Sequence, residues 1–215
     1  MTVEWKNRAG VVIIGGGILG IATAYYLAKF GVKDVTVLEK GTVCSGSTGR
    51  CGAGIRAQWG TEMNCRLGIA SLDIFEHLDD ELGMPVGLSQ EGYLLVAYTE
   101  REFENLRRGM KLQNSLGINS RELSLPEARG ICPALDASDA VGFIYHARDG
   151  HADPFLTTAA YLEAAKRLGV SYFKGTEATG ITVRGNRAAG VDTSRGRIDA
   201  GIVINCAGAY AQDVA

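Results

Sequence analysis

The stretch VVIIGGGILG, at residues 11–20, decides the fold. Its first four residues form a short apolar run, which is typical of a buried parallel strand, and a glycine-rich turn follows directly. Apolar side chains then recur at helical spacing as far as Gly31, a residue suited to the left-handed conformation that ends many helices. A second apolar run at residues 35–38 completes a βαβ unit, for which a right-handed crossover is expected.

The glycines of this turn, Gly15, Gly17 and Gly20, fit the pattern G-x-G-x-x-G. The pattern alone is weak, but here it joins a strand to a helix, and Glu39 ends the next strand about 20 residues later, as in dinucleotide-binding domains. In such a turn a pyrophosphate approaches the helix N-terminus, here at Ile18, while the acid accepts hydrogen bonds from ribose hydroxyls. The sequence therefore predicts a dinucleotide site, and the motif leaves FAD and NAD open.

Residues 45–59, SGSTGRCGAGIRAQW, bear on the choice between these cofactors. Hydroxyls at Ser47 and Thr48, with the N–H groups that the glycines expose, suit a loop that cradles an anion or faces a flat ring. An NAD domain would instead continue with alternating helices and strands. The stretch favours a flavin. The alternative is a solvated surface loop, in which Ile55 and Trp59 would be unusual.

Helix signals follow along the chain. Ser124 with Glu127 forms a capping-box pattern, and Asp153 with Pro154 forms an N-cap and first-turn pair, so each predicts a helix start. We expect a strand in residues 91–98 and a helix over 100–116. One amphipathic helix is expected over residues 64–82, with an apolar stripe of Leu67, Ile74, Phe75, Leu78 and Leu82.

Residues 170–206 change in character. They alternate in short segments with turns at 185–186 and 195–196, which predicts a meander of short antiparallel strands. The apolar segment at 202–205 is expected to form one further strand that runs into glycine.

Composition excludes several classes of function. The 22 basic and 24 acidic residues give a net charge of -2, so there is no basic surplus to bind nucleic acid or anionic lipid. The start of the chain lacks the features of a signal peptide, and no apolar run reaches the roughly 20 residues of a membrane span, which favours a cytoplasmic location. Five cysteines without a CxxC pair predict neither disulfides nor a metal site, with Cys51 as a small packing residue and Cys65, Cys132 and Cys206 in the core.

Six segments resemble those of the D-amino-acid-oxidase-like FAD-dependent oxidoreductases in their residues and in their order along the chain. They are GGGILG, VLEKG, GSTGRCGAGIR, DGHADPF, ATGITVRGNRAAGVDTSRG and IVINCAGAYA. The stretch from GSTGR to GIRAQW is most similar to the β subunits of sarcosine oxidase and of dye-linked L-proline dehydrogenase. Members of the family run well beyond residue 215, so the resemblance implies a C-terminally truncated chain; a natural C-terminal tail is the alternative.

The resemblance implies an α/β fold with two parts. A Rossmann-like FAD-binding domain, with its βαβ unit and β-meander, would comprise residues 1–80 and 145–215 and be incomplete at its C-terminus. Residues 81–144 would form part of an α+β substrate domain. The positions implied around FAD are Gly15, Gly17, Ile18, Gly20, Glu39, Lys40, Ser47, Arg50, Cys51, Gly52, Gly54, Ile55, Ala178, Ala207 and Gly208.

Arg56 is the catalytic candidate that the resemblance implies. A guanidinium fork would hold a substrate carboxylate in two parallel hydrogen bonds, whereas a structural surface arginine is the alternative. Trp59 and His151 would join it in binding substrate, although a loop histidine can simply be solvated. The histidine that carries covalent FMN in some β subunits falls on Pro154, which speaks against such a link. His77 and His146 lie in no motif and receive no role.

The implied activity is oxidation of the C–N bond of a small amino acid, such as sarcosine, proline, glycine or a related amine. Hydride would pass to flavin N5, and electrons would leave to oxygen or to a partner subunit. The alternative is a flavin-carrying electron-transfer or structural subunit of a hetero-oligomeric dehydrogenase. We expect these 215 residues alone to retain FAD weakly or not at all and to show little activity.

Overall fold

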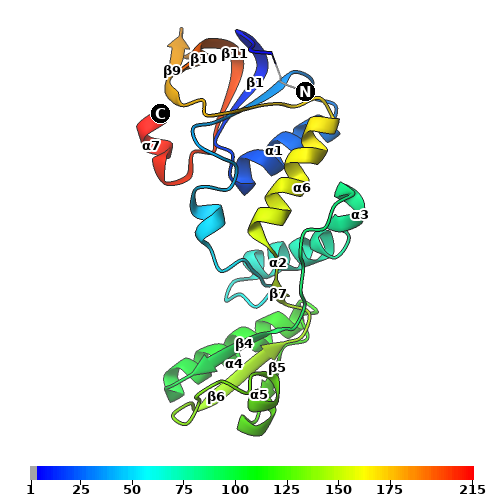
Figure 1. Ribbon diagram of the computed structural model, residues 1–215. Coiled ribbons are helices and arrows are strands. Elements are labelled where there is room, and N and C mark those ends of the chain that lie inside the picture. Colours follow the sequence, from blue (N-terminus) through cyan, green and yellow to red (C-terminus); the bar gives the residue numbers. More distant parts are fainter. Residues whose placement is uncertain (1–3) are drawn as a thin grey trace. The chain divides into compact units, whose positions relative to one another are not determined.

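The computed structural model describes residues 4–215, which form two compact units (Figure 1). Unit 1 holds the described residues up to Gly52 together with Asp80–Val86 and Asp153–Ala215, and unit 2 holds Ala53–Asp79 and Gly87–Ala152.

The predicted functional domains follow other boundaries. Residues 53–79 and 145–152, predicted to belong to the FAD-binding domain, lie in unit 2, and residues 81–86 of the predicted substrate domain lie in unit 1. Compactness and function are separate criteria, so the functional division stays a prediction.

Unit 1 is built on a six-stranded sheet in the order β8–β2–β1–β11–β10–β9. Strand β1 pairs in parallel with β2 and β11, and β2 pairs in parallel with β8. Strands β9, β10 and β11 pair antiparallel. The strands are β1 (Arg8–Ile14), β2 (Val35–Glu39), β8 (Ser171–Lys174), β9 (Ala178–Arg184), β10 (Arg187–Thr193) and β11 (Gly196–Asn205). This mixed sheet confirms the predicted α/β fold.

The predicted meander is wrong in two details. Residues 171–174 pair in parallel with β2, because they follow a helix that crosses back over the sheet. Residues 196–205 form one strand rather than two: its first half pairs with β10 and the rest with β1. The turn at Gly185–Asn186 is as predicted, with both residues at positive φ, at 54° and 63°, as a two-residue hairpin requires.

Two helices of unit 1 pack side by side, α1 (Ile18–Lys29) and α6 (Pro154–Arg167) (Figure 1). The rings of Tyr25 and Tyr161 meet edge to face at 5.4 Å between centroids. As predicted, Asp153 caps α6, since its carboxylate accepts from the first free N–H groups of that helix at 2.8 and 2.9 Å. The shorter elements of this part are η1 (Ser47–Arg50), η2 (Gly208–Tyr210) and α7 (Ala211–Val214).

Unit 2 has a three-stranded antiparallel sheet in the order β4–β6–β5, and a two-stranded pair of β3 and β7. The predicted capping box at Ser124 and Glu127 is present. The elements are β3 (Gly54–Ile55), α2 (Glu62–Phe75), β4 (Tyr93–Ala97), α4 (Glu100–Ser115), β5 (Arg121–Leu123), α5 (Leu125–Ile131), β6 (Gly142–His146) and β7 (Gly150–His151). A short helix, α3 (Leu78–Leu82), lies where the chain passes from unit 2 to unit 1.

The single helix predicted over residues 64–82 is wrong, because α2 ends at Phe75 and α3 begins at Leu78. The predicted stripe is also wrong in part: Leu67 and Ile74 are 59% and 44% exposed. The buried face of α2 instead carries Cys65, Gly68 and Leu72. A Cβ at Gly68 would lie 2.7 Å from the Cα of Ala57, so this helix packs closely on that loop.

The predicted core positions of Cys132 and Cys206 need correction. Cys65 is buried as predicted, but Cys132 is exposed just after α5 ends, and Cys206 is half-buried. Within residues 4–215, no helix has both the length and the apolar character needed to cross a membrane.

Candidate functional site

The glycine-rich turn lies at the carboxyl end of β1, between that strand and α1. Gly15 has a φ of +114°, and a Cβ there would lie 2.3 Å from the carbonyl oxygen of Cys206. A Cβ at Gly20 would lie 2.0 Å from the carbonyl oxygen of Gly15. Both distances are impossible for a side chain, so glycine is required for the turn and for the close packing of α1 on the strand.

Glu39 ends β2 and lies against the same turn. Its carboxylate is buried and accepts hydrogen bonds from the backbone N–H groups of Gly16 and Gly41, each at 2.7 Å. One bond uses Oε2 and the other Oε1, so each oxygen retains a lone pair for a further donor. A carboxylate oriented in this way can accept the ribose hydroxyls of a dinucleotide.

The loop of residues 45–52 is fastened to the turn. The N–H of Ile18, in the first turn of α1, donates to Oγ1 of Thr48 at 3.1 Å, and the N–H of Cys44 donates to the carbonyl of Gly16 at 3.1 Å. Gly17, the N-cap residue of α1, has no side chain to make such a bond. Thr48 therefore caps α1 from 30 residues away, and the loop is a structured part of the site rather than a solvated linker.

Within that loop the predicted cofactor residues occupy exposed or half-buried positions. Ser47 and Arg50 begin and end η1, and Cys51 follows it, where its thiol donates to the carbonyl of Thr48 at 3.0 Å. Gly52 has open space at its Cβ position. Cys51 is exposed, so the predicted packing role is wrong.

The other predicted cofactor residues of unit 1 lie at two further strand ends. Ala178 begins β9 and is buried, while Ala207 and Gly208 follow the carboxyl end of β11, beside β1. Lys40 directly follows Glu39, and its Nζ lies 3.5 Å from the centroid of the Tyr210 ring.

These features of unit 1 fit a dinucleotide. The first turn of α1 is accessible, since Leu19 is 73% exposed, and a helix N-terminus of this kind favours a phosphate group. A Cβ at Gly17 would approach Thr48 Oγ1 to 3.1 Å and narrow the space beside that helix end. The turn, the capped helix and the buried carboxylate meet at the carboxyl ends of parallel strands, where open α/β sheets bind ligands.

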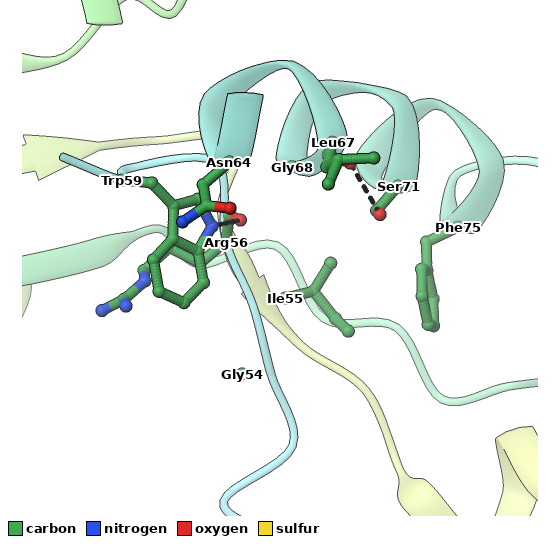
Figure 2. Close-up of a pocket in the computed structure, with 9 residues that line it drawn as sticks. All are labelled: Gly54, Ile55, Arg56, Trp59, Asn64, Leu67, Gly68, Ser71 and Phe75. Carbon is green, nitrogen blue, oxygen red and sulfur yellow. Dashed lines mark hydrogen bonds between the residues drawn. The ribbon is translucent and has the colours of Figure 1, made fainter. Parts of the chain in front are cut away.

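Arg56 lines a pocket of about 360 Å³ in unit 2 (Figure 2). The guanidinium carbon lies 4.1 Å from the centroid of the Trp59 ring and 5.3 Å from that of Tyr93. Trp59 is held in place because its indole N–H donates to the carbonyl of Arg56 at 2.9 Å. Figure 2 shows the Arg56 side chain alongside the Trp59 indole, with Ile55 and Phe75 at the other end of the pocket.

Arg56 has no ion pair or side-chain hydrogen bond to any of residues 4–215. Arg148 of the same unit, by contrast, forms ion pairs with Asp73 and Glu76, and its Nη2 lies 2.6 Å from Glu76 Oε2. A guanidinium that stacks on aromatic rings and lacks a carboxylate partner can bind the carboxylate of a ligand.

The structure groups some of the predicted substrate-site residues and separates another. Arg56 and Trp59 line the same pocket, together with Gly54 and Ile55, which were predicted to lie around FAD. His151 is exposed and does not line it; its backbone instead pairs with Ser89 on one side. Sequence reasoning missed several lining residues, because no local motif marks them: Asn64, Leu67, Gly68, Ser71 and Phe75, with Tyr93 stacked on the arginine.

Two cysteines of unit 1, Cys44 and Cys206, are poor nucleophiles. Burial raises the pKa of the Cys44 and Cys206 thiols, so both stay protonated near neutral pH. Within the described residues, no cluster of histidine, cysteine and carboxylate side chains could hold a metal ion.

The fold and the turn define a dinucleotide-binding α/β protein, and comparison with known proteins gives its family. Residues 10–215 match DAO, the FAD dependent oxidoreductase family, and the chain belongs to that family, whose cofactor is FAD.

Three relatives illustrate the similarity. The chain is 32% identical over 203 residues to sarcosine oxidase subunit beta of Rhodobacter capsulatus, which covers 92% of this chain and 49% of that protein. It is 31% identical over 212 residues to mitochondrial dimethylglycine dehydrogenase of Rattus norvegicus, covering 98% of this chain and 25% of that protein. The crystal structure of L-proline dehydrogenase from P. horikoshii has a TM-score of 0.90 and 36% identity, over 98% of this chain and 55% of that one. The chain thus spans between a quarter and about half of these relatives' lengths.

Proposed function

We propose that the protein carrying this chain oxidises the C–N bond of a small amino acid with FAD as the hydride acceptor. The substrate class is a secondary or tertiary amine derived from glycine, or a cyclic amine such as proline. The names of the relatives support this class, since they refer to sarcosine, dimethylglycine and L-proline. The observation that carries the proposal is the Arg56 guanidinium, unpaired among the described residues, in an aromatic pocket.

Each part of the Arg56 pocket has a task in this proposal. Arg56 would bind the substrate carboxylate through two N–H groups and so fix which C–H bond is presented for oxidation. Trp59 and Tyr93 flank the guanidinium and limit its side-chain freedom. Ile55 and Phe75, which line the same pocket, would receive the apolar N-alkyl part and exclude water.

In unit 1, the chain's own groups would hold the cofactor. The first turn of α1 would face the pyrophosphate, and Glu39 would accept from the adenosine ribose hydroxyls. When bound, FAD supplies the hydride acceptor for this oxidation. The further cofactor positions proposed in this unit are Lys40, Ser47, Arg50, Cys51, Gly52, Ala178, Ala207 and Gly208.

The proposal is tested with Arg56→Ala and Arg56→Lys in the complete FAD-loaded protein. Loss of a charged, bidentate partner should raise the KM for sarcosine, dimethylglycine or L-proline by about 100-fold in Arg56→Ala. Arg56→Lys should raise the KM less, because lysine keeps the positive charge but cannot form the two parallel hydrogen bonds of a guanidinium. FAD content, measured from the visible spectrum, should be unchanged in both. An unchanged KM for every substrate that the wild-type protein oxidises would refute the proposed role of Arg56.

A second candidate is a flavin-carrying subunit of a hetero-oligomeric dehydrogenase, in which another chain binds the substrate. The similarity to a relative named as a subunit favours it. In that case Arg56→Ala would leave the activity of the assembled complex unchanged. Size-exclusion chromatography of the protein purified from its source, with identification of co-eluting chains, tests whether partner subunits exist.

A further inference from the structure

Unit 2 contains a buried histidine–aspartate pair that the proposed function does not use. Nδ1 of His146 lies 2.7 Å from Oδ1 of Asp149, and the two side chains are 8% and 0% exposed. Because an ionised carboxylate only accepts hydrogen bonds, Nδ1 is the nitrogen that donates. The same Oδ1 accepts the backbone N–H of Ala57 at 2.9 Å. Ala57 is the residue that follows Arg56, so the pair is bonded to the backbone beside the proposed substrate arginine.

Asp149 is held in an energetically costly way. Its Oδ2 is buried and has no hydrogen-bond partner among the described residues. Burying a carboxylate with half of its accepting capacity unused destabilises a fold, so the arrangement is better explained by a positional task than by stability. The bonds that Asp149 does make point to that task, because both run through the oxygen that contacts Ala57.

The backbone on both sides of Arg56 is tied to the segment that carries Asp149. Ile55 pairs with Gly150, and Gly54 pairs with His151, in the two-stranded β3–β7 pair. After this pair, the N–H of Ala57 donates to the side chain of Asp149, where a longer strand would use a backbone carbonyl. Arg56 is therefore fixed between Ile55 and Ala57, with anchors on either side.

A second route connects His146 to the arginine. Tyr93 of β4 is the residue opposite His146 in β6, and the Tyr93 ring is one of the two that flank the Arg56 guanidinium. The histidine is thus hydrogen-bonded to the aspartate that anchors Ala57, and it is opposite Tyr93 in the sheet. His146 also lines a second cavity of about 280 Å³, together with Ala57, Ile69 and Leu72.

We propose that His146 and Asp149 are a positioning pair for Arg56: they hold the Ala57 N–H, and through it set where the guanidinium meets the substrate carboxylate. This inference rests on the proposed function, since it assumes that Arg56 binds substrate. His146 and Asp149 contact neither substrate nor cofactor in this scheme, and act only through the arginine.

The test uses His146→Ala and Asp149→Asn in the complete FAD-loaded protein, with the exposed His77→Ala as the matched control. His146→Ala should raise the KM for the amino acid substrate by about tenfold with little change in kcat, because a displaced binding group weakens binding before chemistry. Asp149→Asn keeps an oxygen that can accept the Ala57 N–H, so it should raise the KM less. It also provides a milder variant in case His146→Ala fails to fold. His77→Ala should match the wild type.

Two further readouts separate positioning from a general structural role. Removing His146 enlarges the 280 Å³ cavity that it lines, so added imidazole should enter and restore the KM of His146→Ala. In the double variant with Arg56→Ala, the effect of His146→Ala should vanish, because the pair acts through that arginine.

The outcomes distinguish the two proposals. If Arg56→Ala leaves KM unchanged, the proposed function fails and the positioning role fails with it. If Arg56→Ala raises KM but His146→Ala does not, or if the two effects simply add and imidazole restores nothing, only the positioning inference is overturned.

Discussion

The glycine turn of unit 1 and the arginine pocket of unit 2 are built in opposite ways. The turn is a backbone structure: Gly15 and Gly20 lie where any Cβ would collide with a carbonyl oxygen. The pocket is a side-chain structure, in which the Arg56 guanidinium lies over the ring of Trp59, three residues along the chain, and near the ring of the distant Tyr93. Cofactor binding is therefore expected to depend on glycines that tolerate no side chain. Substrate binding is expected to depend on side chains whose substitution lowers the affinity only in part.

The largest effect is expected from Gly20→Ala. The added Cβ would lie 2.0 Å from the carbonyl oxygen of Gly15, so strand and helix must move apart. We expect a loss of about 3 kcal/mol in the free energy of unfolding, and loss of bound FAD. The control is Gly201→Ala, where no atom lies within 4 Å of the new Cβ. Urea unfolding and the flavin absorbance measure both effects, and a Gly20→Ala protein that retains FAD and its stability would contradict the backbone account of the turn.

A smaller effect is expected from Glu39→Gln. The carboxylate accepts the N–H groups of Gly16 and Gly41, and an amide can accept only one of them while its NH₂ group faces the other donor. Leaving one buried donor unpaired should cost about 2 kcal/mol. Glu177→Gln, at an exposed glutamate without a side-chain partner in the described chain, is the matched control. Equal stability of the two variants would show that the bonds of Glu39 are unimportant.

Acid should affect unit 2 through Glu76. Its hydrogen bond from Arg148 lowers its pKa from 4.5 to about 2, so the folded form binds the proton less readily than the unfolded form. The stability that this bond provides is present above about pH 4.5 and is lost as the pH falls through about 2. Solvent screening of this exposed pair leaves about 1 kcal/mol. Glu76→Gln should flatten the pH dependence of unfolding over that range, whereas an unchanged profile would show that the ion pair is not the cause.

The smallest effect concerns the loop that caps α1. Thr48→Val removes the hydroxyl that accepts the Ile18 N–H at 3.1 Å, and should cost about 0.5–1 kcal/mol of stability. Ser47→Ala, one residue earlier and exposed, should cost nothing measurable. If thermal unfolding shows the same midpoint for both variants, the loop is not fastened through Thr48.

These differences explain what could be predicted from the sequence. Gly15, Gly20 and Glu39 lie in and just after a βαβ unit, so their spacing, together with the apolar runs on either side, predicts the unit and the glycine turn. The helix over 64–82 was predicted wrongly because large apolar residues such as Leu67 suggested the core face. The core face uses Leu72 together with Cys65 and Gly68, and a search for large apolar residues cannot find the two small residues. The small size of Gly68 admits the backbone of Ala57.

The rest of the candidate site could not be predicted, because its contacts span the chain. Thr48 caps a helix that starts 30 residues earlier, and Asp149 bonds to Ala57 across 92 residues. His146 lies in no motif, and only the register of β4 on β6 shows that it is opposite Tyr93. Long-range contacts of this kind follow from tertiary structure and leave no local pattern.

The central claim is that unit 2 binds the substrate carboxylate through Arg56. It is tested most directly by anaerobic reduction of the bound flavin, followed at its visible absorbance, with sarcosine and with dimethylamine, which lacks the carboxylate. The account predicts that the wild-type protein binds sarcosine about 100-fold more tightly than dimethylamine, and that this preference disappears in Arg56→Ala while the FAD content stays the same. If Arg56→Ala keeps the full preference for the carboxylate-bearing substrate, the claim is wrong.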